Sequence, residues 1–192
     1  MATYVLIHGA GSDSWYWHRV APELRALGHE VVAVDLPCDD DSAGFSEYTE
    51  TVVRDIGDRT GLIVVEWWAN TGYAEAVRAQ AERDGRPSGG EFDPREVFFH
   101  DVPPAVVEEA FARGEKAQSG PPFEMPWPLE HWPEVPTRFL LCRDDRFFPA
   151  EFLRRVVVER LGIVPDEMGG GHLPALGRPK ELASRLEAYR VG

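Results

Sequence analysis

The sequence has few cysteines, few basic residues and no long apolar run, and each shortage argues against a class of protein. Its two cysteines, Cys38 and Cys142, show no C-x-x-C spacing, which argues against a disulfide framework or a zinc ribbon. Lys plus Arg total 20 against 33 Asp plus Glu, a net charge of −13, so we expect neither nucleic acid nor an anionic membrane as a partner. No window approaches the roughly 18 apolar residues of a membrane span.

The same shortages favour a globular protein of the cytoplasm. Thiols without a pairing pattern suit a reducing compartment. Residues 1–8 lack the basic region and the long apolar stretch of a secretion signal. With 43% hydrophobic residues in 192, the chain is long enough for one sizeable core. We find no close-spaced metal ligands and no dinucleotide motif, so we expect no metal and no cofactor.

Apolar runs alternate with helical patterns in the first third of the chain and again near its end. Strands and helices in this alternation are typical of right-handed βαβ units on a parallel sheet. We expect strands at residues 4–7, 31–34, 62–65, 137–142 and 164–168, and helices at residues 14–27, 46–59, 149–161 and 179–189.

The middle of the chain has a different amino-acid composition. Residues 84–94 are rich in Gly and Pro, and residues 119–136 contain six prolines. Such a segment is a poor part of a sheet but a suitable rigid cover for a cleft. We therefore expect residues 67–136 to form a helical lid on a core made of residues 1–66 and 137–192.

Three features carry candidate chemistry. Gly9 and Ala10 lie in the turn between the first strand and the first helix, where backbone N–H groups can stabilise an oxyanion; a tight connection or a phosphate cradle are the alternatives. Asp145 follows the strand at 137–142 and is placed to orient a histidine, although a helix cap or a solvated acid is the common interpretation and Asp144 competes with it. His172 follows three glycines, which permit backbone angles closed to other residues.

The order of these features indicates a family. The stretch His8-Gly9-Ala10-Gly11-Ser12-Asp13-Ser14-Trp15-Tyr16-Trp17, then Gly28-His29-Glu30-Val31 and Asp35-Leu36-Pro37, resembles the opening of small α/β-hydrolases of the esterase and hydroxynitrile lyase type. Asp145 with Pro149, and Gly170-Gly171-His172, are similar to that family's acid and histidine motifs. The resemblance implies an α/β-hydrolase fold, hydrolysis of carboxylic esters, an oxyanion donor at Ala10 N–H, a triad acid at Asp145 and a general base at His172.

The nucleophile of that family is missing. A strand like the one at 62–65 leads in such hydrolases into a G-x-S-x-G elbow, but here it runs into Glu66, and no G-x-S-x-G occurs in the chain. The resemblance implies that a helix and a strand, a unit of about 30 residues, are absent here. Three explanations stay open. The chain is an internally deleted variant, a segment of an intact enzyme has been omitted, or another residue (Ser12, Ser14 or Glu66) acts in catalysis.

Two kinds of function follow from this gap. An active enzyme would bind a small apolar ester-like molecule in a pocket that we assign to Gly9, Trp67 and Trp127. The alternative is a non-catalytic small-molecule-binding module, for which we expect a homo-oligomer that buries exposed sheet faces. If the gap closes up, the sheet is reduced to about five strands, in the order 31–34, 3–7, 62–65, 137–142, 164–168.

Overall fold

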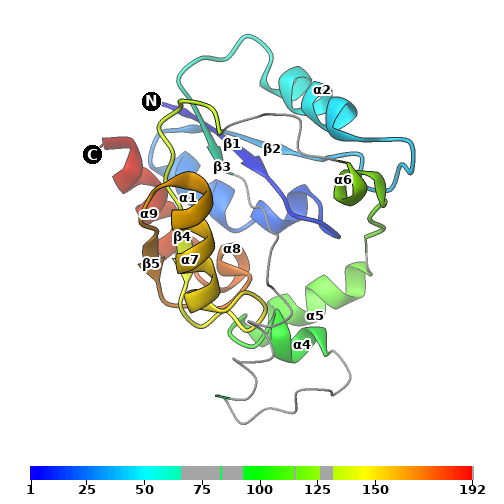
Figure 1. Ribbon diagram of the computed structural model, residues 1–192, viewed down its shortest axis with the longest axis vertical. Coiled ribbons are helices and arrows are strands. Elements are labelled where there is room, and N and C mark those ends of the chain that lie inside the picture. The colour runs from blue at the N-terminus through cyan, green and yellow to red at the C-terminus, as the bar shows by residue number, and fades with distance from the viewer. Residues whose placement is uncertain (66–82, 84–92, 115, 126–131, 192) are drawn as a thin grey trace. The chain divides into compact units, whose positions relative to one another are not determined.

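The computed structural model describes residues 1–65, 83, 93–114, 116–125 and 132–191, which Figure 1 draws in colour. The chain divides into two compact units, and each is described by itself. Unit 1 consists of Met1–Trp68, Glu109–Glu130 and Pro179–Gly192, and unit 2 of Ala69–Glu108 and His131–Arg178. This division does not test the expected lid at residues 67–136, which stays a prediction.

Unit 1 contains a sheet of three parallel strands. The middle strand, β1 (Thr3–Ile7), pairs with β2 (Glu30–Val34) on one side and with β3 (Leu62–Val65) on the other, as Figure 1 shows. Residues 4–6 of β1 have no exposed surface. An apolar run without alternation is typical of a strand covered on both faces. The three strands expected in this part of the sequence are confirmed.

The helix expected after β1 is divided into two. A 3-10 helix, η1 (Ser14–Trp17), precedes α1 (Val20–Ala26). The sequence offers Asp13 or Ser14 as the cap of this helix, and Asp13 is the cap, because its side chain accepts a hydrogen bond from the N–H of Trp15 at 3.1 Å. Leu27 is 51% exposed, because it is the C-cap of α1 and lies beyond the helical spacing that placed it on the buried face.

Three further helices complete the description of unit 1. They are α2 (Phe45–Ile56), α6 (Pro121–Glu124) and α9 (Pro179–Val191). The α9 helix packs against α1, so the end of the chain returns to the first helix. The helices expected at 46–59 and 179–189 are therefore confirmed, with ends that differ by two or three residues.

A polar network joins β1 to α9 within unit 1. Glu187 accepts a hydrogen bond from the Tyr4 hydroxyl at 3.1 Å and lies 2.9 Å from Nε2 of the buried His29. Arg190 donates to the other carboxylate oxygen at 2.6 Å. The hydrogen bond from Arg190, with that from Tyr4 and the Arg190 charge, lowers the pKa of Glu187 from 4.5 to about 2.

This network predicts a loss of stability in acid. Because the folded pKa of Glu187 is depressed, its stabilising effect is present above about 4.5 and is lost as the pH falls toward about 2. We expect the free energy of unfolding in urea to fall more steeply from about pH 5 to about pH 3 in the wild type than in Glu187→Gln. Glu159→Gln, at an exposed pair with Arg155, is the control and should follow the wild type. Equal slopes for all three proteins would contradict the prediction.

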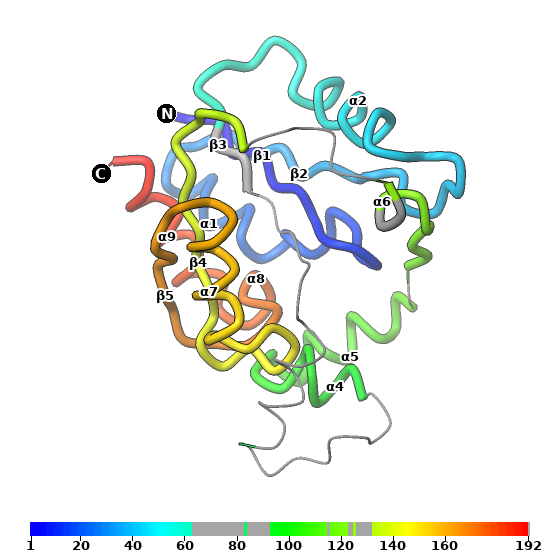
Figure 2. Tube along the Cα trace, viewed as in Figure 1, coloured from blue at the N-terminus to red at the C-terminus, as the bar shows by residue number. Residues whose placement is uncertain are grey.

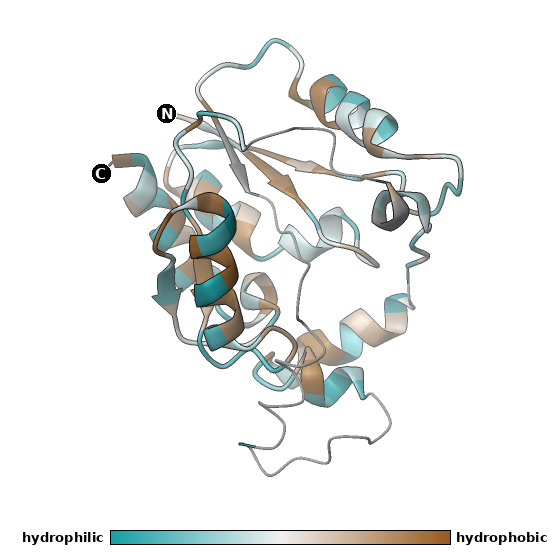
Figure 3. Cartoon of the chain, viewed as in Figure 1, coloured by the Kyte–Doolittle hydropathy of each residue, from teal (hydrophilic) through white to brown (hydrophobic). Residues whose placement is uncertain are grey.

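Unit 2 contains a two-stranded parallel sheet, β4 (Leu140–Cys142) paired with β5 (Asp166–Met168). Figure 2 follows the chain from β4 through α7 (Ala150–Leu161) to β5 and α8 (Pro174–Gly177). In Figure 3, α7 carries hydrophobic and hydrophilic colour on different faces, and its buried residues are Phe152, Leu153 and Val157. Also in this unit are α4 (Pro94–Val97) and the first half of α5 (Pro104–Arg113), whose residues 109–113 belong to unit 1.

The five expected strands are present, but their ladders form two sheets. The orders β2–β1–β3 and β4–β5 agree with the expected neighbours inside each sheet. β3 belongs to unit 1 and β4 to unit 2, so the pairing expected across the gap stays a prediction. The β4 strand begins at Leu140 instead of Thr137, and its three residues pair with β5 within unit 2.

Candidate active site

Unit 2 brings Asp145 and His172 together. Asp145 follows β4, His172 follows β5, and the imidazole Nδ1 lies 3.0 Å from Oδ2 of the carboxylate. Only 7% of the Asp145 side chain and 18% of the His172 side chain are exposed, so the contact is shielded from water. A carboxylate at Nδ1 selects the tautomer with a proton on that nitrogen. Nε2 then keeps its lone pair and can accept a proton.

The backbone fixes the carboxylate of Asp145. Its Oδ1 accepts hydrogen bonds from the N–H groups of Phe147 at 2.8 Å and Phe148 at 2.9 Å, which leaves Oδ2 for the histidine. Asp144, the competing acid in the sequence, binds the N–H of Gly170 instead, at 2.8 Å. Asp145 is therefore the acid that orients His172.

Three phenylalanines surround the His172 ring. The ring centroids of Phe98, Phe147 and Phe148 lie 4.9, 5.0 and 5.4 Å from that of the imidazole. Aromatic walls exclude water, and the lower local polarity strengthens the contact between His172 and Asp145. Phe147 and Phe148 follow Asp145 in sequence, whereas Phe98 comes from the C-cap of α4 and no pattern indicated it.

Two more carboxylates hold the loop that carries His172. Asp144 accepts from Gly170 N–H and donates its own N–H to the Gly170 carbonyl at 3.0 Å. Asp101, in the segment between α4 and α5, accepts from Gly171 N–H at 2.7 Å. Gly170 has φ +113°, a left-handed conformation that favours glycine, as expected for this loop. Sequence reasoning missed Asp101, because 70 residues separate it from Gly171.

The turn after β1 lies in unit 1. The His8 ring is buried, its Nδ1 is 2.9 Å from the Gly9 carbonyl, and its Nε2 accepts from the Leu36 N–H at 3.1 Å. Nδ1 is therefore the donor, and the ring ties the turn to the end of β2. Gly9 is half-buried and Ala10 is exposed. None of the hydrogen bonds among the described residues uses the Ala10 N–H, so this group is available to an oxyanion.

A comparison with protein families identifies the fold family. The sequence model of the "Alpha/beta hydrolase family" matches residues 4–66 and 57–185. The chain belongs to the alpha/beta hydrolase family. A curated relative, methylesterase 2 of Arabidopsis thaliana, is 54% identical over 33 residues, which are 17% of this chain and 12% of that protein. The chain therefore matches only a short part of the length of that curated relative.

Solved structures of hydrolases are similar in fold to this chain. A pyrethroid hydrolase from Sphingobium faniae has a TM-score of 0.70 with 20% identity, covering 100% of this chain and 98% of its own. Polyneuridine aldehyde esterase has a TM-score of 0.70 with 18% identity, covering 98% of both chains. At these identities the likeness shows the fold alone.

Ser14 and Cys142 carry groups that could replace the nucleophile of a serine hydrolase, but the Ser14 hydroxyl is hydrogen-bonded and the Cys142 thiol has a raised pKa. The Ser14 hydroxyl donates to Asp35 Oδ2 at 3.0 Å, and its N–H donates to Oδ1 at 2.7 Å. Burial, and then the charge of Asp145, raises the pKa of the Cys142 thiol to about 12, so this thiol stays protonated at neutral pH. The sequence candidates Glu66, Trp67 and Trp127 lie outside the described residues.

The described part of unit 2 has a cavity lined mostly by charged side chains. Its volume is about 520 Å³, and it is lined by His100, Asp101, Arg143, Asp144, Asp145, Arg146, Ala150, Glu151 and Arg178. Across the described residues, no three His, Cys, Asp or Glu side chains are grouped so that they could hold a metal ion. Nor does any helix in these residues combine the length and apolar character that crossing a membrane requires.

Proposed function

We propose that this alpha/beta hydrolase derives from a serine carboxylic-ester hydrolase and has lost the step that needs the serine. It keeps an oriented acid–base pair and an oxyanion turn, and it carries out little or no acyl-enzyme chemistry. The observation that carries the proposal is the 3.0 Å contact between Asp145 and His172 in a chain without a G-x-S-x-G elbow. The pair can accept a proton as a general base, but the serine hydroxyl of the elbow, which would donate that proton, is missing.

The chemistry of an intact relative shows what is lost. There, a serine oxygen attacks the ester carbonyl, its proton passes to the histidine Nε2, and backbone N–H groups such as that of Ala10 hold the oxyanion. Without the serine, the bond from enzyme to acyl group cannot form. What remains for His172 is to take a proton from a water that attacks the ester directly. General base catalysis alone contributes roughly 10²–10⁴-fold, far below the rate enhancement of an intact serine hydrolase.

The family match supports a discontinuity at the end of β3. Its two stretches, 4–66 and 57–185, overlap at residues 57–66, next to the junction of Val65 and Glu66. A pattern that stops and restarts at this point is what the loss of an elbow, a helix and a strand would produce. This agrees with the first two explanations left open by the sequence, an internally deleted variant and an omitted segment of an intact enzyme.

The ligand class and location are part of the proposal. We assign a small apolar ester-like molecule as the ligand, supported by fold neighbours named as a pyrethroid hydrolase and as polyneuridine aldehyde esterase. Trp67 and Trp127 stay predicted pocket residues. The cytoplasm is the proposed location, because Cys38 and Cys142 are both buried free thiols. A homo-oligomer is the proposed way to cover apolar surface left by the missing block.

Covalent labelling tests the loss of the nucleophile. The protein is incubated with a fluorophosphonate probe, labelled residues are located by mass spectrometry, and hydrolysis of p-nitrophenyl butyrate is followed. We expect no single labelled serine, and turnover in the wild type far below the rate enhancement of an intact serine hydrolase. An intact mass checks that residues 65 and 66 are joined. Rapid labelling of one serine, lost in His172→Ala, would overturn the proposal.

Two controls separate the remaining explanations. Labelling that disappears in Ser14→Ala would identify the Ser14 hydroxyl as a replacement nucleophile. The hydroxyl would then have to leave its hydrogen bond to Asp35. Saturable binding of p-nitrophenyl butyrate without turnover, measured by calorimetry, would support a non-catalytic binding module. Turnover that survives in Ser14→Ala but is lost in His172→Ala would support direct attack by water.

A further inference from the structure

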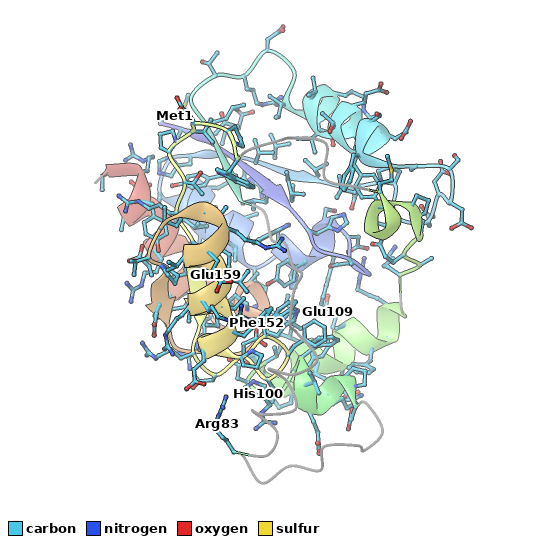
Figure 4. All side chains as sticks on the ribbon, in the orientation of Figure 1. Met1, Arg83, His100, Glu109, Phe152 and Glu159 are labelled. Carbon is cyan, nitrogen blue, oxygen red and sulfur yellow. The ribbon has the colours of Figure 1, made fainter. Side chains whose placement is uncertain are left out.

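The loop that carries His172 has an anchor from a distant part of unit 2. Asp101 lies between α4 and α5, and its Oδ2 accepts the hydrogen bond from Gly171 N–H at 2.7 Å. His100, the neighbour of Asp101, is labelled in Figure 4. Only 19% of the Asp101 side chain is exposed, and Gly171 is buried. A short hydrogen bond from a carboxylate to a buried backbone amide holds the position of that amide strongly.

We propose that Asp101 is a positioning residue for His172, acting through the backbone of Gly171. The inference rests on the proposed pairing of Asp145 with His172 as acid and base. Its test observes that pairing directly and not ester turnover, so a failure of one proposal can be told from a failure of the other.

Three successive residues of the loop are each held by a different carboxylate. Gly170 N–H goes to Asp144, Gly171 N–H to Asp101, and the ring of His172 to Asp145. Asp144 and Asp145 are neighbours in the loop after β4, so they hold the histidine loop from one side. Asp101 belongs to the segment between α4 and α5, and it holds Gly171, the residue directly before His172.

The packing around Asp101 shows why its position is well defined. A Cβ placed on Gly171 would lie 2.6 Å from Asp101 Oδ1 and 2.5 Å from His100 Nε2, so both side chains lie directly against the glycine backbone. Arg178 Nε lies 3.8 Å from Asp101 Oδ2 and compensates part of its charge. The carboxylate therefore has little room to move away from the Gly171 amide.

Removing the carboxylate has a measurable consequence for both residues of the loop. A hydrogen bond to a charged group stabilises enough to slow local opening by roughly ten- to a hundredfold. In Asp101→Ala we expect hydrogen exchange of the Gly171 amide to accelerate by about this factor. We also expect the proton resonance of His172 Nδ1–H to broaden or disappear, because the ring is no longer held against Asp145.

The experiment is NMR of the full chain with three variants. Asp101→Asn keeps a carbonyl acceptor, so we expect it to retain the His172 Nδ1–H resonance and to speed Gly171 exchange by less than about fivefold. Glu108→Ala removes an exposed acid of α5 that pairs with Arg95 and should match the wild type in both measurements. A purely structural role of Asp101 would lower global stability without moving the Nδ1–H resonance in the folded protein.

Each result decides for or against the inference. A folded Asp101→Ala with an unchanged Nδ1–H resonance and unchanged Gly171 exchange overturns it. The inference is also overturned if Asp101→Asn changes the Nδ1–H resonance and Gly171 exchange as much as Asp101→Ala does. The ion pair between Asp101 and Arg178, and not the hydrogen bond to Gly171, would then account for the effect. If Asp101→Ala does not fold, Asp101→Asn decides alone: a retained resonance supports the inference, and a lost one rejects it.

Discussion

Replacing Gly171 with alanine is expected to cost about 1–3 kcal/mol of stability, the usual price of overpacking. The added Cβ would stand 2.5 Å from His100 Nε2 and 2.6 Å from Asp101 Oδ1, distances that force both side chains to move. Movement of Asp101 also breaks its hydrogen bond to the Gly171 amide. The free energy of unfolding in urea measures the cost, and the His172 resonance should change with it.

Gly169 offers a matched control in the same loop. A Cβ there would have its nearest neighbours, Arg143 and Arg178, at 3.7 Å, an ordinary contact distance. Its φ lies outside the left-handed range, so alanine fits its backbone. We expect Gly169→Ala to change stability by less than about 0.5 kcal/mol. If the two alanine variants are equally stable, the close approach at Gly171 has no energetic weight and the prediction fails.

The second large effect is expected in the core of unit 1. Leu6 of β1 has no exposed surface, and truncating a fully buried leucine to alanine costs about 2–5 kcal/mol. Whole domains have only about 5–15 kcal/mol of net stability. We therefore expect Leu6→Ala to lower the urea midpoint strongly, or to give protein that does not fold at 37 °C.

Leu27 provides the comparison. It is the same residue type, but it is 51% exposed at the C-cap of α1. We expect Leu27→Ala to cost less than about 1 kcal/mol, so the difference between the two variants isolates burial. A loss for Leu6→Ala as small as that for Leu27→Ala would show that β1 is not the packed centre of this unit.

Local patterns in the sequence predicted most of the secondary structure. The uninterrupted apolar run of β1 and the cap at Asp13 depend on residues next to each other, and both are confirmed. The break between η1 and α1 was not predicted, because the apolar spacing continues across it. The ladder expected between β3 and β4 stays a prediction, since the two strands belong to different units and strand pairing depends on contacts that no local pattern specifies.

The candidate site was predictable where residues follow strands. The positions of Asp145 and His172 after two strands indicated their contact, and the three glycines indicated an unusual loop, which φ +113° at Gly170 confirms. Asp101 and Phe98 were missed. Their roles arise from packing between segments about 70 residues apart, for which one sequence carries no signal.

The supports of His172 have a consequence for how such proteins change over time. Among the described residues, the groups that hold its ring or its loop, from Phe98 to Asp145, come from unit 2. An event that removes the nucleophile after β3 therefore leaves the histidine and its partners untouched. Under the proposed function, the residues for proton transfer are inherited separately from the residue that forms the bond to the acyl group. It can outlast the activity it once served, and it remains a ready starting point for a new one.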